Sequence, residues 1–423
     1  MKWRNVAVVL ALFAVAVCPP RRFDFAQGKL AAQSSGDLFN GQVLQRIDID
    51  LHSADWAKLK QDFRSNEYYP ADITWNGIKA YNAGIRSRGV ASRSGTKPAL
   101  RLDFNHYASG QSYLGLKSLV LDNLVQDPSG VHEATSMWFF ARLGIPAPRE
   151  AHVVVYVGGE YAGLYTAVEP IDKTMIARVF GNEENGQQND GYLYEFNKAD
   201  EWWLSYLGPD IDPYKKYFEA KTHETSSDET LYRPLETIVR LINEKPPEEL
   251  AESVNPYLDL RALTRFIAVQ NFLGEIDGFA GKWGMNNFYL YRRQHQQQHV
   301  VIAWDDDLTF ADPSYELTSY QDNNVLVRKL MAIPEYHTLY FDTLMEAMQS
   351  AAHADADPRF GALESEIRRE LDLIHDAMLA DHVRPSTDTE YLDAREFMTL
   401  FAQRRIRYVE CEVARLTGAR PCE

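Results

Sequence analysis

The residues most able to do chemistry lie between Asn271 and Phe310, in the stretch NFLGEIDGFAGKWGMNNFYLYRRQHQQQHVVIAWDDDLTF. Asp277 stands in a Gly-rich loop, Asn287 opens an apolar run, and Asp305 and Asp307 follow a second apolar run. Mg²⁺ prefers oxygen ligands and is commonly held by one or two carboxylates together with phosphate oxygens. A further carboxylate can accept the proton of an attacking hydroxyl. The types and order of these residues therefore favour metal-assisted phosphoryl transfer.

Two short apolar runs on either side of a Gln-rich segment must bring these side chains together. Alternating apolar residues on both sides of a polar turn predict a β-hairpin. Such a hairpin puts Asn287 before its first strand and Asp305 after its second, and if the second strand continues, Asp305 and Asp307 share one face. The alternative interpretation is an acidic turn after a strand, with Asp277 as a solvated loop residue.

The order of base, metal-binding amide, hairpin and metal-binding Asp also occurs in protein kinases. Here Asp277 and Asn287 are separated by a longer, Gly-rich loop than in the usual kinase catalytic loop. The sequence WDDD at 304–307 stands where kinases have Asp-Phe-Gly. The order therefore indicates kinase-like chemistry on an altered spacing.

A basic, Gly- and Ser-rich segment, GIRSRGVASRSGTKPALRLDF, lies upstream. Arg88 and Lys97 stand in its loop, and Arg101 stands on the strand that follows. Backbone N–H groups and cations in such a loop can cradle phosphates, although a solvated hairpin with surface arginines has the same composition. Glu133, near the start of a predicted helix, could pair with Lys97 as kinases pair a strand Lys with a helix Glu. The alternative is a Glu that the helix dipole favours there.

The composition and the order of elements bound the fold. The chain has 423 residues, of which 45% are hydrophobic, and its net charge of -16 disfavours a nucleic-acid partner. Strands and turns dominate residues 38–169, and helical periodicity dominates residues 170–423. This predicts an α+β fold with two lobes, a β-rich N-lobe at 38–169 and a mainly helical C-lobe at 170–423 that contains the active-site hairpin.

The N-terminus has the pattern of an export signal. Lys2 and Arg4 precede an apolar run from Val6 to Val17, which is short for a membrane span and suits a signal-peptide core. We expect residues 1–33 to be signal peptide and leader, with no stable membrane span after cleavage. The expected location is secreted or extracytoplasmic, in the periplasm or at the cell surface. A lipid anchor at Cys18 and an uncleaved membrane anchor are the alternatives.

Two cysteines, Cys411 and Cys422, lie close together at the end of the expected mature chain. In an oxidising compartment they could form a disulfide that closes a small loop and fastens the last helix. Two unpaired thiols are the alternative interpretation.

From about Gly84 to Asp307 the chain resembles the CotH kinase family, the secreted kinases named for spore coat protein H. The segments that carry the resemblance are GIRSRGVASRSGTKPALRLDF, EATSMWFFARLGIPAP, VYVGGEYAGLYTAVE, NNFYLY and AWDDDLTF. The resemblance implies a divergent protein-kinase-like fold that uses ATP and Mg²⁺ or Mn²⁺. It also implies phosphorylation of Ser or Thr on a secreted or cell-surface protein.

The resemblance further implies roles for particular residues. Asp277 would be the catalytic acid/base, and Asn287, Asp305 and Asp307 would be metal ligands. The expected cofactor-binding residues come from the basic segment, the helix that follows it and the end of the GEYAGLYTAVE motif: Arg88, Lys97, Arg101, Glu133 and Glu169. One position departs from the family pattern, because Asn286 stands where we expect a His before Asn287.

Two other classes of function remain open. The first is a non-catalytic, pseudokinase-like surface or envelope protein that binds or assembles other proteins. The second is a metal-dependent hydrolase or nucleotidyl transferase that uses the same carboxylates, with AMP transfer distinguished only by the pose of the nucleotide. The complete set of acids favours the kinase over the non-catalytic protein.

Overall fold

The computed structural model of the chain describes residues 33–181, 189–355 and 357–419. The expected signal peptide and leader, residues 1–33, therefore lie outside the described residues except for residue 33, and so does Cys18. The predicted lobe boundaries stay predictions. Among the described residues, no helix combines the length and the apolar character that crossing a bilayer demands.

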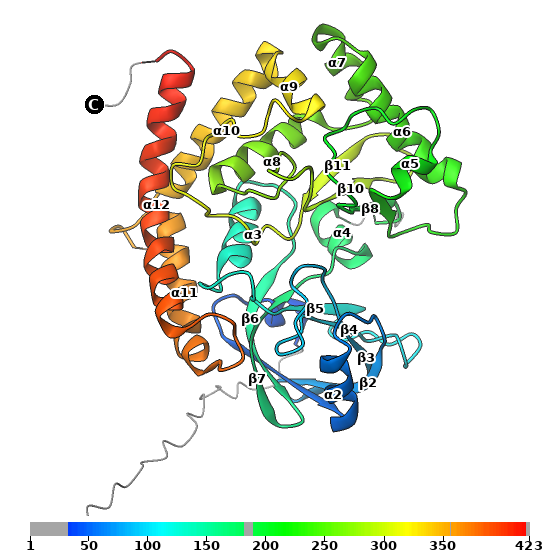
Figure 1. Cartoon of the computed structure of the whole chain (residues 1–423), viewed down its shortest axis with the longest axis vertical. Coiled ribbons are helices and arrows are strands. Elements are labelled where there is room, and N and C mark those ends of the chain that lie inside the picture. Colours follow the sequence, from blue (N-terminus) through cyan, green and yellow to red (C-terminus); the bar gives the residue numbers. More distant parts are fainter. Residues whose placement is uncertain (1–32, 182–188, 356, 420–423) are drawn as a thin grey trace, which may run out of the picture. The chain divides into compact units, whose positions relative to one another are not determined.

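Seven strands in the first part of the chain close into a barrel (Figure 1). The order around the barrel is β1-β2-β3-β4-β5-β7-β6, and the parallel pairing of β1 with β6 closes it. Closure leaves no strand edge open. The strands are β1 (Gln45–Leu51), β2 (Tyr69–Trp75), β3 (Ile78–Ser87), β4 (Leu100–Asp103), β5 (Ser118–Asp122), β6 (Glu150–Val157) and β7 (Glu160–Val168).

Alternation along each strand divides the barrel residues between an apolar interior and an outer face. On β4, Leu100 and Leu102 are buried in the interior, so Arg101 between them lies on the outer face. The buried Trp75 indole donates to Gln45 Oε1 at 2.9 Å, so this interior polar group is satisfied. The barrel therefore presents Arg101 outward.

A second sheet has the order β11-β10-β8-β9 and comprises β8 (Tyr192–Phe196), β9 (Phe218–Ala220), β10 (Phe288–Arg292) and β11 (His299–Ala303). The predicted hairpin is confirmed, because β10 and β11 pair antiparallel. Val120 and Val168 on the outer face of the barrel pack with Tyr289, Ile302 and Trp304 of this sheet. The two sheets thus meet where the chain places its candidate site.

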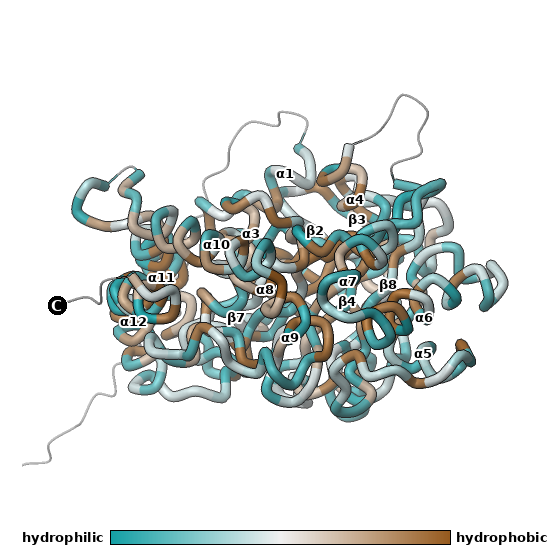
Figure 2. The backbone as a smooth tube through the Cα atoms, turned by 90° about the horizontal axis from the view of Figure 1, so that it is seen from above, coloured by the Kyte–Doolittle hydropathy of each residue, from teal (hydrophilic) through white to brown (hydrophobic). Residues whose placement is uncertain are grey.

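Helices make up most of the chain after the barrel, which confirms the predicted α+β class. Figure 2 shows α8 among the hydrophobic stretches, and almost all of its residues are buried. The helices are α1 (Ser35–Leu38), α2 (Ser53–Gln61), α3 (His132–Arg142), α4 (Lys173–Phe180), α5 (Asp212–Lys215), α6 (Asp228–Glu244), α7 (Pro247–Val254), α8 (Leu260–Leu273), α9 (Val325–Met331), α10 (Pro334–Ala352), α11 (Ala362–Ala380) and α12 (Asp388–Leu416).

The long last helix, α12, fastens the C-terminal end of α8. Arg405 is fully buried and donates to the carbonyl oxygens of Phe272 at 2.8 Å and Asn271 at 2.5 Å. These carbonyls belong to the last turn of α8, where intrahelical donors run out, although the N–H of Gly274 also donates to Asn271 O at 3.2 Å. Cys411 on α12 is disulfide-bonded, and its predicted partner, Cys422, lies outside the described residues.

A buried ion pair ties the barrel to the C-terminal helices. Lys97 Nζ donates to Asp381 Oδ2 at 2.7 Å, and the two side chains are 1% and 0% exposed. Asp381 follows α11 and also accepts from the N–H of Leu164. Gly163 allows this close approach, because a Cβ there would lie 2.9 Å from Lys97 Cε and from Asp381 Oδ2.

His299 holds the start of β11 to the segment before α8. Its backbone N–H and its ring Nδ1 both contact the carbonyl oxygen of Tyr257, at 2.7 and 2.8 Å. Burial lowers the pKa of His299 from 6.5 to about 4. The unfolded chain therefore takes up a proton as the pH falls below about 6.5, whereas the folded chain does so only near pH 4. Stability from the neutral ring is complete above that window and is lost as the pH falls through it.

We expect Lys97→Met to lower the free energy of unfolding by about 3–5 kcal/mol, because it leaves the Asp381 carboxylate buried and unpaired. Adding Asp381→Asn should recover part of that loss, since the amide keeps an acceptor for the Leu164 N–H and carries no charge. Urea denaturation of the three proteins measures both effects. A stable Lys97→Met protein would contradict the structural role.

The pH dependence of stability gives a second test of the fold. Between about pH 7 and pH 4 the wild-type chain should lose about 3 kcal/mol through His299, and His299→Gln should not, because its amide keeps a donor for Tyr257 but does not titrate. Urea denaturation at several pH values in this range compares the two proteins. Parallel pH profiles would show that His299 does not contribute.

Candidate active site

Asp277 lies in a tight loop that follows α8. Gly274 ends α8 in a left-handed conformation (φ 71°), and the N–H of Asn286 closes the loop by donating to Gly278 O at 3.1 Å. The Asp277 carboxylate accepts hydrogen bonds from Lys198 Nζ at 2.7 Å and from Asn286 Nδ2 at 2.8 Å. It is fixed from two sides while its side chain stays 14% exposed, which suits a group that must reach a substrate hydroxyl.

The two donors to Asp277 were not found by sequence reasoning. Lys198 stands 79 residues before Asp277, on the segment after β8, and no local pattern connects the two. Asn286 was noted only as a departure from the family pattern, where a His is expected. Its amide orients Asp277, so this position retains a hydrogen-bond donor.

The ends of the β10–β11 hairpin carry the predicted metal ligands. Phe288 pairs with Ala303 across the hairpin, so Asn287 and Asp305 lie just beyond the paired strands. Both have a left-handed backbone, with φ of 60° and 56°, which Asn and Asp tolerate better than most residues. Among the described residues, the side chains of Asn287, Asp305 and Asp307 have no hydrogen-bond partner. Their oxygens therefore remain available to a ligand.

The strand before these acids ends earlier than expected. β11 stops at Ala303, so the condition under which Asp305 and Asp307 would share one face of a continuing strand is not met. The left-handed Asp305 breaks the strand, and Asp306 turns inward, fully buried, to accept from Gln270 Nε2 at 2.8 Å. Asp306 is thus a structural acid, while its two neighbours stay half-buried.

Negative charge dominates the space between the hairpin and the barrel. Burial raises the pKa of Asp305 to about 6, and the charge of Asp122 adds to this effect. Burial also raises the pKa of Asp307 well above its usual range, with Asp305 as the next cause. In the first turn of α3, burial raises the pKa of Glu133, and nearby carboxylates raise it further. These groups would lose mutual repulsion if a cation bound among them.

Arg88, directly after β3, brings positive charge to these acids. Its guanidinium lies 4.0 Å from the Asp122 carboxylate and 5.7 Å from the centre of the Trp304 ring. Burial lowers the pKa of Arg88, but the charges of Asp305, Asp122 and other carboxylates outweigh burial and raise it. Arg88 therefore links the barrel electrostatically to the end of the hairpin.

The expectation that Lys97 pairs with Glu133 is wrong. Lys97 is fully engaged with Asp381 on the other side of its loop. The loop between β3 and β4 turns Arg88 toward the acids instead, and the charge of Glu133 is among those that act on Arg88. Composition predicted a cation near these acids, and Arg88 is the cation that lies there, whereas Lys97 is buried and paired with Asp381.

Glu169 is also occupied elsewhere. Its carboxylate is fully buried and accepts from Arg149 Nη2 at 2.7 Å and from Arg178 Nη2 at 2.6 Å. These bonds hold the end of β7 to α4 and to the segment before β6. A buried carboxylate with two guanidinium partners has a structural role, and the expected role of Glu169 in binding a cofactor stays a prediction.

Arg101 lies beside the site rather than among its acids. It is on the outer face of β4, where its Nη2 lies 3.4 Å from Ser118 Oγ. Its charge acts on Tyr289 of β10, so it faces the second sheet. Arg101 and Arg88 are thus the two predicted cofactor-binding cations that remain near the hairpin.

The donor set fits a hard divalent cation completed by a ligand. Asn287, Asp305 and Asp307 supply amide and carboxylate oxygens without internal partners, and these are the atoms that Mg²⁺ and Mn²⁺ prefer. No three His, Cys, Asp or Glu side chains form a complete metal cage within the described part of the chain. A site with two carboxylates leaves coordination positions for phosphate oxygens.

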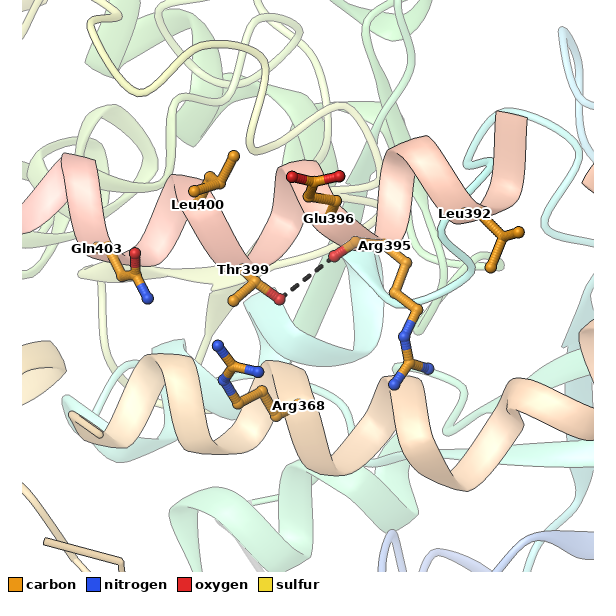
Figure 3. A pocket seen from close by; sticks show the side chains of 7 residues that line it. All are labelled: Arg368, Leu392, Arg395, Glu396, Thr399, Leu400 and Gln403. Atoms are coloured by element: carbon orange, nitrogen blue, oxygen red, sulfur yellow. Dashed lines mark hydrogen bonds between the residues drawn. The ribbon is translucent and has the colours of Figure 1, made fainter. Parts of the chain in front are cut away.

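A separate hollow lies between α11 and α12 (Figure 3). Its volume is about 340 Å³, and its lining comes from the surfaces of these two helices: Arg368, Leu392, Arg395, Glu396, Thr399, Leu400 and Gln403. None of the predicted site residues belongs to it. This hollow therefore takes no part in the arrangement around Asp277 and the hairpin.

Comparison with known proteins finds similar sequences and folds. The Inner spore coat protein H of Bacillus subtilis (strain 168) is 24% identical over 341 residues, which cover 78% of this chain and 88% of that protein. The proinflammatory kinase CtkA of Helicobacter pylori shares 11% identity, with 75% of this chain and 95% of that chain covered and a TM-score of 0.29.

A toxin–antitoxin complex of HipA, HipB and operator DNA from Shewanella oneidensis MR-1 contains a chain with 13% identity. The match covers 86% of this chain and 74% of that chain, with a TM-score of 0.34. At such TM-scores neither structure carries an argument. The family described as CotH kinase protein, however, matches residues 85–409, most of the chain and all of its candidate site. The chain is therefore kinase-like and belongs to the CotH kinase family.

Proposed function

We propose that this chain is an ATP- and metal-dependent protein kinase that transfers phosphate to Ser or Thr of an extracytoplasmic protein. The observation that carries the proposal is the grouping of unpartnered oxygen donors at the hairpin ends beside an anchored Asp277. A phosphoryl-transfer enzyme needs a metal site, cations for phosphate and a base for the acceptor. The family membership of the chain supports the same reaction class.

Bound ATP supplies the γ-phosphoryl group, and a divalent metal neutralises its developing charge. Asn287, Asp305 and Asp307 would hold the metal through their oxygens, since these side chains lie at the hairpin ends and remain partly accessible. Arg88 and Arg101 bind phosphate oxygens from the barrel side. Glu133 lies close enough for its charge to act on Arg88 and is proposed to face the bound cofactor with it.

Asp277 accepts the proton of the acceptor hydroxyl as that oxygen bonds to the γ-phosphorus and ADP leaves. Lys198 and Asn286 each donate a hydrogen bond to one oxygen of the carboxylate, so the proposed base keeps its orientation toward the acceptor. Glu275 also stabilises the loop, because its carboxylate accepts a hydrogen bond from the N–H of Asp277 at 2.5 Å. These three hydrogen bonds hold the side chain of Asp277 in one orientation.

The proposed location and acceptor protein follow from two features. The signal-like N-terminus favours export, and the relative from Bacillus subtilis is named as a spore coat protein. Both features fit a secreted or surface protein as the acceptor. A non-catalytic, pseudokinase-like assembly protein would share the fold and the location, and the two variants below separate it from a kinase.

We expect Asp305→Asn to weaken metal-dependent nucleotide binding at least about tenfold, because the amide removes a negative ligand from the metal. Asn tolerates the left-handed backbone at this position, so the variant isolates the charge. Calorimetry with ATP, with and without Mg²⁺ or Mn²⁺, measures the change, and Asp50→Asn on the exposed face of β1 is the matched control. Unchanged metal-dependent affinity would remove Asp305 from the metal site.

Asp277→Asn should keep metal and ATP binding, because the side chain keeps its size and its hydrogen-bond acceptor. Phosphate transfer to a protein acceptor or to the chain itself should fall by about two orders of magnitude or more, the scale for losing a general base. If the chain is a non-catalytic binding protein, neither the wild type nor Asp277→Asn will transfer phosphate. Wild-type transfer by folded Asp277→Asn protein would move the base to Asp307.

A further inference from the structure

The tip of the Asp277 loop exposes a tryptophan between two lysines. Trp283 is 41% exposed, and the ammonium groups of Lys198 and Lys282 each lie 5.3 Å from the centre of its ring. Lys198 is also the side chain that donates to Asp277 Oδ1 at 2.7 Å. One ammonium group thus contacts the proposed base and the exposed ring together. The surface formed by Lys282 and Trp283 therefore adjoins the place where an acceptor hydroxyl must bind.

The backbone that carries this surface is firmly held. The N–H of Lys282 donates to Ile276 O at 2.8 Å. A Cβ on Gly284 would lie 3.0 Å from the backbone N of Trp202, so the loop packs closely on the segment after β8. Trp283 is therefore an aromatic side chain presented by an ordered loop. Such a side chain gives contact area on binding at a small cost in conformational entropy.

The charges around Trp283 discriminate between acceptors. Lys282 forms no ion pair with a carboxylate of the described residues, although the chain as a whole has a net charge of -16. A Lys or Arg of an acceptor would meet two ammonium groups instead of a free aromatic face. A carboxylate would find the unpaired ammonium of Lys282, with the exposed Glu201 on the adjacent segment as a partial offset.

We propose that Lys282 and Trp283 form an acceptor-binding surface that selects Ser or Thr residues with Asp or Glu beside them in the sequence. This inference rests on the proposed kinase function and adds the class of acceptor. The acidic side chain of the acceptor contacts Lys282, its backbone lies against Trp283, and its hydroxyl reaches Asp277. Acidic protein segments are thus the substrates of this site, and basic segments are rejected by repulsion.

The experiment compares two synthetic peptides that differ only in whether Glu or Lys residues flank a single Ser. Using the full chain with ATP and Mg²⁺ or Mn²⁺, we expect a KM at least about tenfold lower for the Glu peptide. Lys282→Glu should abolish that preference, mainly through KM rather than kcat. Trp283→Ala should raise the KM of both peptides. The matched control is Lys60→Glu on α2, because Lys60 Nζ also lies 5.3 Å from a tryptophan ring, that of Trp56.

The outcomes separate this inference from the function on which it rests. Equal use of the two peptides, or preference for the Lys peptide, overturns the acceptor surface and leaves the kinase proposal standing. No transfer to either peptide, to dephosphorylated casein or to histone overturns the kinase proposal and the inference with it. A shift caused equally by Lys60→Glu and Lys282→Glu would assign the preference to overall charge and overturn the surface.

Discussion

Uncompensated negative charge between the barrel and the hairpin is the constraint around which this protein is built. Burial and mutual repulsion raise the pKa of Asp305, Asp307 and Glu133, and Arg88 opposes this effect from the barrel. Gathering acids in this way costs folding free energy unless cations arrive. The barrel, the start of α3 and the hairpin must therefore be stable enough from their own apolar packing to hold the acids together before a ligand binds.

A single amide connects the two halves of the site. Gln270 on α8 donates to Asp306 at 2.8 Å and accepts from the N–H of Phe279 at 2.9 Å. The first bond fixes the acidic end of the hairpin, and the second fixes the loop that carries Asp277. Because α8 is buried along almost its whole length, this amide stands on a rigid support. The spacing between the proposed base and the proposed metal ligands is thereby set by one helix.

The features that the sequence predicted depend on residues close together in the chain, and the features that it missed depend on residues far apart. The hairpin, the Asp277 loop and the Asn and Asp at the hairpin ends were predicted because each depends on residues within one short stretch. The missed contacts join distant residues: Lys97 and Asp381 are 284 residues apart, and Lys198 and Asp277 are 79 residues apart. Periodicity carries no information about such pairs. A basic loop signals that a cation is needed, but only the packed fold decides whether Arg88 or Lys97 enters the site.

Arg405 gives the site a dependence on the order of synthesis. Besides the last turn of α8, its guanidinium donates to the carbonyl oxygens of Pro313 and Tyr315, and it stands close to the end of the 423-residue chain. While the chain is being made, the carbonyls of Phe272, Pro313 and Tyr315 lack the guanidinium donor until α12 has left the ribosome, and Asn271 O has only the N–H of Gly274. The barrel can form early, as N-terminal units do, but the end of α8, which precedes the Asp277 loop, gains the Arg405 hydrogen bonds only after α12 is made. A nascent chain therefore cannot complete the support of the Asp277 loop before α12 has been synthesised.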